Sequence, residues 1–457
     1  MKKRRIALLL AGSLIMGMLS ACSEGEQPKA DAPGQTTAAQ APVQAEAPKG
    51  TEKKGSEDKV VLNWLHRYPE ERYVDYFQGL ADGYMAEHPN VQINVEVVGD
   101  IAMKDKLKVM VGGGEVPDIF YSWPGEFAGQ FARNDLVLDL TSYIEADQEW
   151  KDSISPVFWD YVDMYDMHVG VPFRFSLSVM EYNKEIFKEC GIEVPETFSQ
   201  LKAACQTLKD HGYIPIAFGD NPNWPTAHYL TQMFPQFVGT DVYNSDCNPA
   251  TGEWTDPGYV EAIKELQELV NTGCFNDNIN SLSYDQATLL FYEKKAAMLY
   301  GGSMAMEKAA QELGDENLGW MKFPVADNAK GTMNTVCGGC DLFLISAKTE
   351  HPDEAVDFLK YITRKENQME LAKQTGLQPI AKDTITEETA HKTIVEFNDY
   401  TFNQSDGITT WIDTAPEPRV KEKFLENLQL IIDGKSAEEI MKEVQEVAKT
   451  VREEYAK

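Results

Sequence analysis

Two periods of apolar and polar residues predict the first elements of the chain. Residues 60–65 form an apolar run that is typical of a strand. Residues 70–87 carry a helical pattern that stops at His88-Pro89-Asn90. Apolar residues then alternate with polar ones over 91–97, which predicts a strand with one buried face. The folded part of the chain is therefore expected to begin with a strand, a helix and a second strand.

A second helix and a third strand continue this order. The helix is predicted over 102–111 and the strand over 117–121, with Gly112-Gly113-Gly114 between them. The glycines lack the Lys and the Ser or Thr of a phosphate-binding P-loop, so they indicate the end of a helix. Alternating strands and helices predict a parallel α/β sheet with right-handed crossovers.

Two later segments have the features of amphipathic helices. Pro352 suits a first helical position, and apolar residues after it share one face. Near the end of the chain, Ser436 and Glu439 form a capping box before an apolar stripe over 440–451. Such a stripe could contact a partner, but packing onto the protein's own body is the better interpretation for one short helix.

The first 58 residues have the composition of a signal and a linker. Cations at positions 2–5 precede an apolar run over 6–19 that is too short for a comfortable membrane span, which predicts a secretory signal. Leu-Ser-Ala-Cys, ending at Cys22, resembles the bacterial lipobox and implies cleavage after residue 21 and lipid on Cys22. The alternative is an ordinary signal with an incidental cysteine. Residues 22–58, which begin with the lipidated Cys, contain few large apolar side chains and are predicted to be a disordered tether.

Composition narrows the classes of function. The chain has 457 residues, of which 43% are apolar, so it can bury a large core, and its length favours two domains. Its formal charge of −31 repels phosphate backbones, which makes nucleic acid an unsuitable partner. No second apolar segment long enough to span a bilayer comes after the signal.

The cysteines leave their pairing open. Besides Cys22 there are six, which permit disulfides in an exported protein but allow 15 pairings, and they can equally be buried thiols. Cys337-Gly-Gly-Cys340 has the spacing of half a zinc site or of a redox motif, but it has no second pair and no matching histidines. We therefore expect no metal and no cofactor.

Several segments in order resemble the extracellular solute-binding proteins of carbohydrate ABC importers, the family 1 lipoproteins similar to maltose-binding protein. The resemblance covers most of residues 59–457, and the segments that carry it are 116–120, 170–173, 180–184, 191–198, 294–303, 338–346 and 351–359. It implies an α/β fold of two lobes, like class II periplasmic binding proteins. Each lobe would be a mainly parallel sheet flanked by helices, and hinge crossings near 171–181 and 331–341 would join the lobes.

The same resemblance implies domains and a function. The N-terminal lobe would contain residues 59–171 plus 337–380, and the C-terminal lobe residues 172–336 plus 381–457. The protein would be a monomeric receptor on the extracellular face of the cytoplasmic membrane, held there by lipid on Cys22. It would close about its hinge on a mono- or oligosaccharide and deliver the sugar to the permease subunits of an ABC transporter, without acting as an enzyme.

A sugar site needs flat aromatic rings bordered by amides, carboxylates and guanidinium groups, because sugars present both C–H faces and hydroxyls. Such residues come after the predicted strands, at the carboxyl ends where open α/β sheets hold ligands. Candidates after the first and third strands are His66, Arg67, Glu70, Trp123 and Glu126. Candidates on the first crossing and in later polar loops are Arg174, Ser176, Asn223, Trp224 and Trp411.

The resemblance supports these candidates unequally. It places Trp123 and Trp411 beside the ligand, puts Arg174 and Ser176 in the cleft, and adds Ser303 and Asp341. Many relatives place Trp after the Gly-Gly-Ser of residues 301–303, where this chain has Met304, so one aromatic platform is missing. Each candidate also has a structural explanation: a tryptophan in the core, an ion pair at His66 or Arg67, a turn capped by Asp341.

Two other classes of function remain as alternatives. A surface glycoside hydrolase needs two carboxylates about 5–10 Å apart, and with 73 acidic residues the presence of a pair is uninformative. The sequence has no eightfold strand-helix repeat, no serine nucleophile elbow and no His-Glu-x-x-His zinc motif. A carbohydrate adhesin would fit the tether but does not require an α/β body of two lobes.

Overall fold

The structure of the chain is a computed structural model that describes residues 59–314 and 316–455. The predicted signal over 1–21, the lipidation site Cys22 and the whole of the predicted tether lie outside the described residues. No helix in the described part is both long and apolar enough to cross a membrane.

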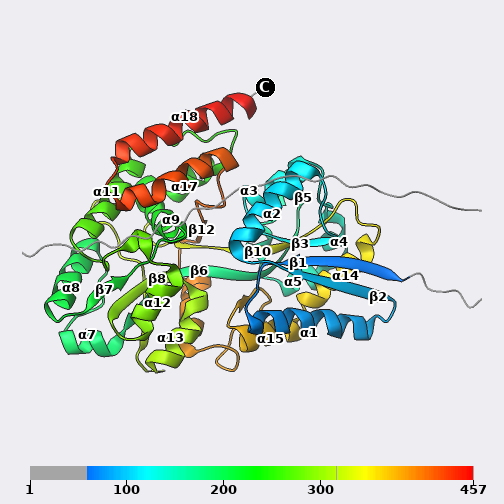
Figure 1. Cartoon of the computed structure of the whole chain (residues 1–457), viewed down its shortest axis with the longest axis horizontal. Helices are drawn as coiled ribbons and strands as arrows, with labels where there is room; N and C mark the ends of the chain where they lie inside the picture. Colours follow the sequence, from blue (N-terminus) through cyan, green and yellow to red (C-terminus); the bar gives the residue numbers. More distant parts are fainter. Residues whose placement is uncertain (1–58, 315, 456–457) are drawn as a thin grey trace, which may run out of the picture. The chain divides into compact units, whose positions relative to one another are not determined.

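The first strands and helices form as the apolar pattern predicts (Figure 1). They are β1 (Val60–His66), α1 (Glu71–Glu87), β2 (Val91–Val97), α2 (Asp100–Gly113) and β3 (Ile119–Ser122). Strand β1 lies in the middle and pairs in parallel with both β2 and β3. The carboxyl ends of these strands therefore meet at one edge of the sheet, as the sequence predicted.

Two long strands continue the sheet and form the predicted crossings. They are β6 (Val171–Asn183) and β10 (Val336–Ile345), and β10 lies antiparallel between β3 and β6. Asp341 on β10 faces Arg174 on β6, and the register shifts between Asp341 and Leu342. This irregularity turns the strand where two oppositely charged side chains meet.

The second part of β6 belongs to a different group of strands. It pairs antiparallel with β8 (Ala296–Gly302) and β9 (Leu318–Met321), and β8 pairs in parallel with β7 (Ile214–Ala217). The hydrogen-bonded order is β2-β1-β3-β10-β6-β8-β7. The mixed α/β class is confirmed, but the expectation of mainly parallel strands needs correction, because the crossing strands lie antiparallel to each other and to β3, β8 and β9, and only residues 408–410 pair with β10 in parallel.

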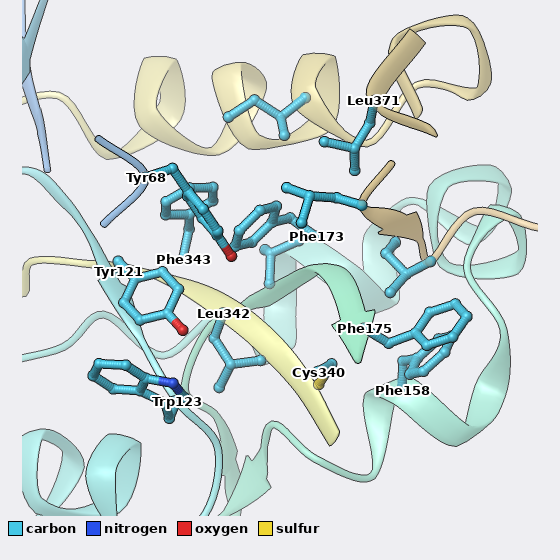
Figure 2. Packing of buried hydrophobic residues seen from close by; sticks show 14 of the residues in the cluster. Tyr68, Tyr121, Trp123, Phe158, Phe173, Phe175, Cys340, Leu342, Phe343 and Leu371 are labelled. Atoms are coloured by element: carbon cyan, nitrogen blue, oxygen red, sulfur yellow. The ribbon is translucent and has the colours of Figure 1, made fainter. Parts of the chain in front are cut away.

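Buried apolar side chains form two clusters. The first packs on β1, β3, β10 and the first part of β6, where the rings of Phe173 and Phe343 stack with centroids 4.2 Å apart. Figure 2 shows Tyr68, Phe173 and Phe343 together, with Tyr121 and Trp123 close by. Aromatic side chains bury large areas, so this cluster fixes the strands that carry the crossing residues.

The second cluster is mainly helical. Its principal helices are α8 (Phe198–Asp210), α9 (Trp224–Val238), α11 (Gly258–Asn271), α17 (Pro418–Ile432) and α18 (Ala437–Tyr455). The apolar stripe predicted near the end of the chain lies on α18, and its Ile440, Val444 and Val451 are buried in this cluster. That confirms the interpretation of the stripe as packing. The exact lobe boundaries stay a prediction.

The other described elements are short. The helices are α3 (Glu126–Arg133), α4 (Thr141–Ala146), α5 (Gln148–Ser153), α6 (Pro156–Trp159), α7 (Lys184–Cys190), α10 (Thr240–Cys247), α12 (Tyr284–Tyr292), α13 (Met306–Leu313), α14 (Pro352–Ile362), α15 (Lys365–Thr375), α16 (Lys392–Asn403) and the 3-10 turns Ile279–Ser281 and Ser303–Ala305. The strands are β4 (Asp163–Met164), β5 (Met167–His168), β11 (Gln378–Pro379) and β12 (Ile408–Thr410). Pro352 starts α14 as predicted.

The six cysteines after Cys22 are all free thiols in the structure. Five are buried, and Cys247 is half-buried. Cys337 and Cys340 lie in the buried interior of β10. Within the described residues, no group of three or more His, Cys, Asp or Glu side chains is placed to hold a metal ion.

Candidate functional site

A cavity of about 620 Å³ lies where the crossing strands meet the loops of both clusters. Its lining combines residues of β6 and β10 with the loop after β1, the start of α2, the start of α9 and the segment after β12. Eight of the predicted site residues line it: Arg67, Glu70, Trp123, Arg174, Ser176, Trp224, Asp341 and Trp411. The structure thus brings together residues from distant parts of the sequence.

One side of the cavity, the charged wall, consists of Arg67, Tyr68, Arg174 and Asp341. Asp341 is buried, and its Oδ2 accepts hydrogen bonds from the Tyr68 hydroxyl, from Arg174 Nε at 2.6 Å and from an Arg67 guanidinium nitrogen at 3.3 Å. Burial opposes ionisation, but Arg174 and Arg67 outweigh it and hold the pKa of Asp341 below its ordinary value. The other oxygen, Oδ1, has no hydrogen-bond partner among the described residues.

Arg67 joins the charged wall to aromatic rings. Its guanidinium carbon lies 4.8 Å from the ring centroid of Tyr68, 5.1 Å from Tyr121 and 5.3 Å from Trp123. It also pairs with Asp100 at 3.1 Å. Because an arginine held between rings and carboxylates has little freedom, its charge and its donors are fixed before a ligand arrives.

A second group of lining residues, the aromatic wall, consists of Trp224, His228, Tyr284 and Trp411. The rings of His228 and Trp411 stack at 5.5 Å with an interplanar angle of 10°. The ring centroid of Trp224 lies 4.7 Å from that of His228 and 4.6 Å from that of Tyr284. Together the rings present a continuous apolar surface with polar edges.

His228 stays uncharged at neutral pH. Burial, with a smaller contribution from Lys104, lowers the pKa of His228 to about 3. Its Nδ1 lies 2.9 Å from the hydroxyl oxygen of Ser178, and this contact holds the ring nearly parallel to that of Trp411. The aromatic wall is therefore neutral.

Gly339 makes room for the Trp411 ring. A Cβ atom at Gly339 would lie 2.9 Å from Cζ3 of Trp411, closer than such atoms normally approach. Trp411 Nε1 is buried and has no acceptor among the described residues. The glycine on β10 thus allows the ring to lie against the crossing strand, with its one donor unused.

Besides the two walls, a pair of charged residues, Asp413 and Lys421, lies after Trp411 in the chain. Burial raises the pKa of Asp413, and its Oδ1 has no hydrogen-bond partner in the described chain. Burial lowers the pKa of nearby Lys421 to about 8, although Asp413 opposes the shift. The Lys421 ammonium lies 3.6 Å from the ring centroid of Phe127. Of these residues Asp413 reaches the cavity, together with Lys104.

Two predicted residues after β1 and β3 do not line the cavity. His66 is buried with its ring 4.6 Å from that of Phe77, and burial lowers the pKa of His66 to about 4. Glu126 forms an ion pair with Arg133 and accepts a hydrogen bond of 2.7 Å from the Tyr165 hydroxyl. His66 points into the core because side chains alternate along a strand, and Glu126 turns back onto its own helix.

Two later candidates are also used for structure. Asn223 donates a hydrogen bond of 2.6 Å to the Leu425 carbonyl. Ser303 is buried, donates to Gln378 Oε1 at 2.8 Å and accepts from the Leu177 backbone N–H at 3.2 Å. Both side chains hold loops together at positions next to cavity residues.

The sequence interpretation left out several lining residues. They are Asp100, Lys104, His228, Ser283, Tyr284, Asp285, Asp413 and Thr414, beside small or apolar positions. A signal existed for some of them. Asp100 and Lys104 come after the carboxyl end of β2, where the same rule that selected Arg67 applies. His228 is one helical turn after Trp224 on α9.

Comparisons with known proteins point to one family. A sequence model of the family described as bacterial extracellular solute-binding protein matches residues 69–369. The chain is 26% identical over 330 residues to the maltotriose-binding protein of Pyrococcus abyssi, across 72% of this chain and 68% of that protein. It is 25% identical over 315 residues to the multiple sugar-binding protein of Streptococcus mutans, across 67% of this chain and 72% of that protein.

A solved structure is also similar to the chain. It comes from work on xylan utilization by the thermophilic bacterium Caldanaerobius polysaccharolyticus and superposes with a TM-score of 0.78 at 27% identity. The superposition covers 85% of this chain and 99% of that chain. The likeness confirms the predicted α/β fold of two lobes.

Proposed function

Because this chain belongs to the family of bacterial extracellular solute-binding proteins, we propose that its cavity captures a mono- or oligosaccharide for an ABC importer. The family is one of receptors that bind solutes outside the cell and do not convert them. Relatives named for maltotriose and for multiple sugars support a carbohydrate as the solute. The cavity volume lies within the range of roughly 300–1,000 Å³ that is usual for small-molecule sites.

The observation that carries the proposal is that one cavity is lined both by aromatic rings and by fixed charged groups. The aromatic wall suits the C–H faces of sugar rings, and Trp123 beside Arg67 adds another ring to the lining. The charged wall offers a fixed carboxylate oxygen of Asp341, and Trp411 offers an unused N–H. Sugar hydroxyls both donate and accept hydrogen bonds, so one saccharide can satisfy both groups.

Hinge closure follows from where the walls are attached. Arg174 lies on β6 and Asp341 on β10, the two crossing strands, whereas Trp224 starts α9. A ligand that contacts both lobes at once would favour the closed arrangement, in which the two lobes approach each other. The closed form would then be recognised by the permease subunits.

The proposal also includes the location of the protein. The predicted signal over 1–21 would be removed, and lipid on Cys22 would hold the receptor to the outer face of the cytoplasmic membrane. Residues 22–58 would tether the binding domain, and the receptor would act as a monomer. Mass spectrometry of the membrane fraction, before and after Cys22→Ala, tests the anchor: loss of the lipid adduct and release of the protein are expected.

The binding experiment uses the chain from residue 23 onward and a panel of mono- and oligosaccharides. Saturable binding should raise the melting temperature, because the sugar binds the native state alone. Chromatography of the incubated sugar should return it unchanged, and new reducing ends would instead indicate the alternative function of a glycoside hydrolase. An absence of binding to every sugar of the panel would contradict the proposal.

A further inference from the structure

The charges around the cavity are unevenly distributed. Its lining contains the five acidic residues Glu70, Asp100, Asp285, Asp341 and Asp413 but only the three basic residues Arg67, Lys104 and Arg174. The basic residues are all engaged within the protein. Arg174 pairs with Asp341, Arg67 with both Asp341 and Asp100, and Lys104 with Asp100 at 3.7 Å.

The acidic residues are not all matched by cations. Among the described residues, neither Glu70 nor Asp285 has a salt-bridge partner, and both are exposed at the cavity. Asp341 and Asp413 are each more than nine-tenths buried, and each has one carboxyl oxygen without a hydrogen-bond partner. An arriving ligand therefore meets the exposed carboxylates of Glu70 and Asp285 and, in the described lining, no unpaired cation.

The helix ends at the cavity are also unfavourable to an anionic ligand. Helices α1, α2 and α12 all begin at the cavity, and helix N-termini would normally attract an anion. Each of these ends already has an acidic side chain of the protein: Glu70 at the N-cap of α1, Asp100 in the first turn of α2 and Asp285 in the first turn of α12. Helix α9 also begins at the cavity and has no acidic residue in its first turn, but the N–H of Thr226 there donates to the carboxylate of Asp220 at 2.9 Å. Acidic groups of the protein thus lie at all four helix ends before a ligand binds.

We propose that this cavity selects uncharged saccharides and rejects those that carry a carboxylate, such as uronic acids. The proposal rests on the proposed function and defines its substrate class more closely. A hydroxymethyl group of a neutral sugar can donate to Asp341 Oδ1, whereas a carboxylate in its place has only acceptors and would face another acceptor. Like charges placed together in a partly desolvated site are strongly unfavourable.

The test compares three forms of one ligand. The best neutral oligosaccharide of the panel is measured by calorimetry beside the same oligosaccharide with its primary hydroxyls oxidised to carboxylates, and beside the methyl ester of that acid. For a pentose oligomer, a form with one uronic acid substituent takes the place of the oxidised form. We expect the acid to bind at least about 10-fold more weakly than the neutral sugar. We expect the ester to recover most of the loss, because it is as large but uncharged.

A double variant tests the source of the selection. In Glu70→Gln with Asp285→Asn, the two exposed acids become neutral, and the preference for the neutral sugar should shrink by about two- to fivefold. Raising the salt concentration should shrink it in the wild type as well. Equal affinity for acid and neutral sugar, or an ester that binds as weakly as the acid, would overturn the inference. If no neutral sugar binds at all, it is the proposed function that fails.

Discussion

The charged wall and the aromatic wall of the cavity differ in how much each depends on a bound ligand. In the charged wall, buried Arg174 and Asp341 stabilise each other, so the wall keeps its shape without a ligand. The aromatic wall consists of neutral rings, and Trp224 and His228 at its surface are only half-buried. The difference teaches that the first wall supplies a fixed orientation, whereas the second supplies contact area that becomes fully buried only when a sugar arrives.

The largest expected effect is on stability and comes from the charged wall. Asp341→Ala leaves the buried guanidinium group of Arg174 without its carboxylate and removes one of the two carboxylates that pair with Arg67, so we expect a loss of about 3–5 kcal/mol in the free energy of unfolding. Urea titration measures it. The control is Glu422→Ala, which removes an exposed ion pair with Lys108 at 3.0 Å and should cost at most about 1 kcal/mol. Similar losses in both variants would mean that the wall is not a mutually dependent unit.

The next effect is on affinity and comes from the aromatic wall. Trp411→Ala removes a ring that lines the cavity, and we expect sugar affinity to fall at least about 10-fold, or about 1.4 kcal/mol. Calorimetry with the best sugar of the panel measures it. The matched control is Trp159→Ala, because Trp159 is equally buried but does not line the cavity. Trp159→Ala should lose stability and keep its affinity for the sugar. If Trp411→Ala kept its affinity while Trp159→Ala lost it, Trp411 would not belong to the binding site.

A smaller effect should follow when the ring is moved rather than removed. In Gly339→Ala the new methyl group would press on Trp411, so we expect an affinity loss smaller than that of Trp411→Ala. Gly79→Ala is the control, since nothing lies within 4 Å of a Cβ there and alanine suits its helix. Unchanged affinity in Gly339→Ala, together with an unshifted tryptophan fluorescence spectrum, would show that the ring does not depend on this glycine.

The smallest effect concerns pH. The pKa of His228 is lowered to about 3 in the folded protein, against about 6.5 in an unfolded chain, so folding expels a proton between these values. His228 therefore contributes a loss of stability as the pH falls from 6.5 towards 3. In His228→Gln this contribution disappears, and the decrease in unfolding free energy from pH 7 to pH 5 should be shallower. Parallel curves for the two proteins would contradict the shift.

The opposing shift of Asp220 does not obscure that comparison. Burial raises the pKa of Asp220 to about 7, so this group favours the folded state as the pH falls, with the opposite sign to His228. It is present in the wild type and in the variant alike. The difference between the two curves therefore reports His228 alone.

Local pattern predicted the elements better than it predicted the site. The elements from β1 to β3 and the stripe of α18 follow from period and capping, which depend on neighbouring residues. The selection of Arg67 followed from its place at a strand's carboxyl end. In contrast, the selection of His66 overlooked a local signal, because alternation along β1 puts His66 on the same face as buried Leu62 and Trp64, whereas Arg67 follows the strand and reaches the cavity.

Long-range partners could not be predicted from the residues alone. Asp341 lies in the site because β10 places it opposite Arg174. The resemblance placed each of these residues near the ligand, but neither it nor the local patterns predicted that they pair. His228 and Asp413 enter the cavity through the packing of α9 and of the segment after β12. Their chemistry was visible in the sequence, but their neighbours were not.

The position of β10 determines when the sheet can be completed. Among the seven strands of the main hydrogen-bonded order β10 is the last to be synthesised, yet it lies between β3 and β6. Strand β6 ends at Asn183 and β10 begins only at Val336, so a long stretch of chain separates β10 from the strands on both of its sides. Until β10 is in place, the edges of β3 and β6 have no partner, and unpaired edges are sites of aggregation. Completion of the sheet therefore requires that these two edges stay shielded until residues 336–345 pair with them.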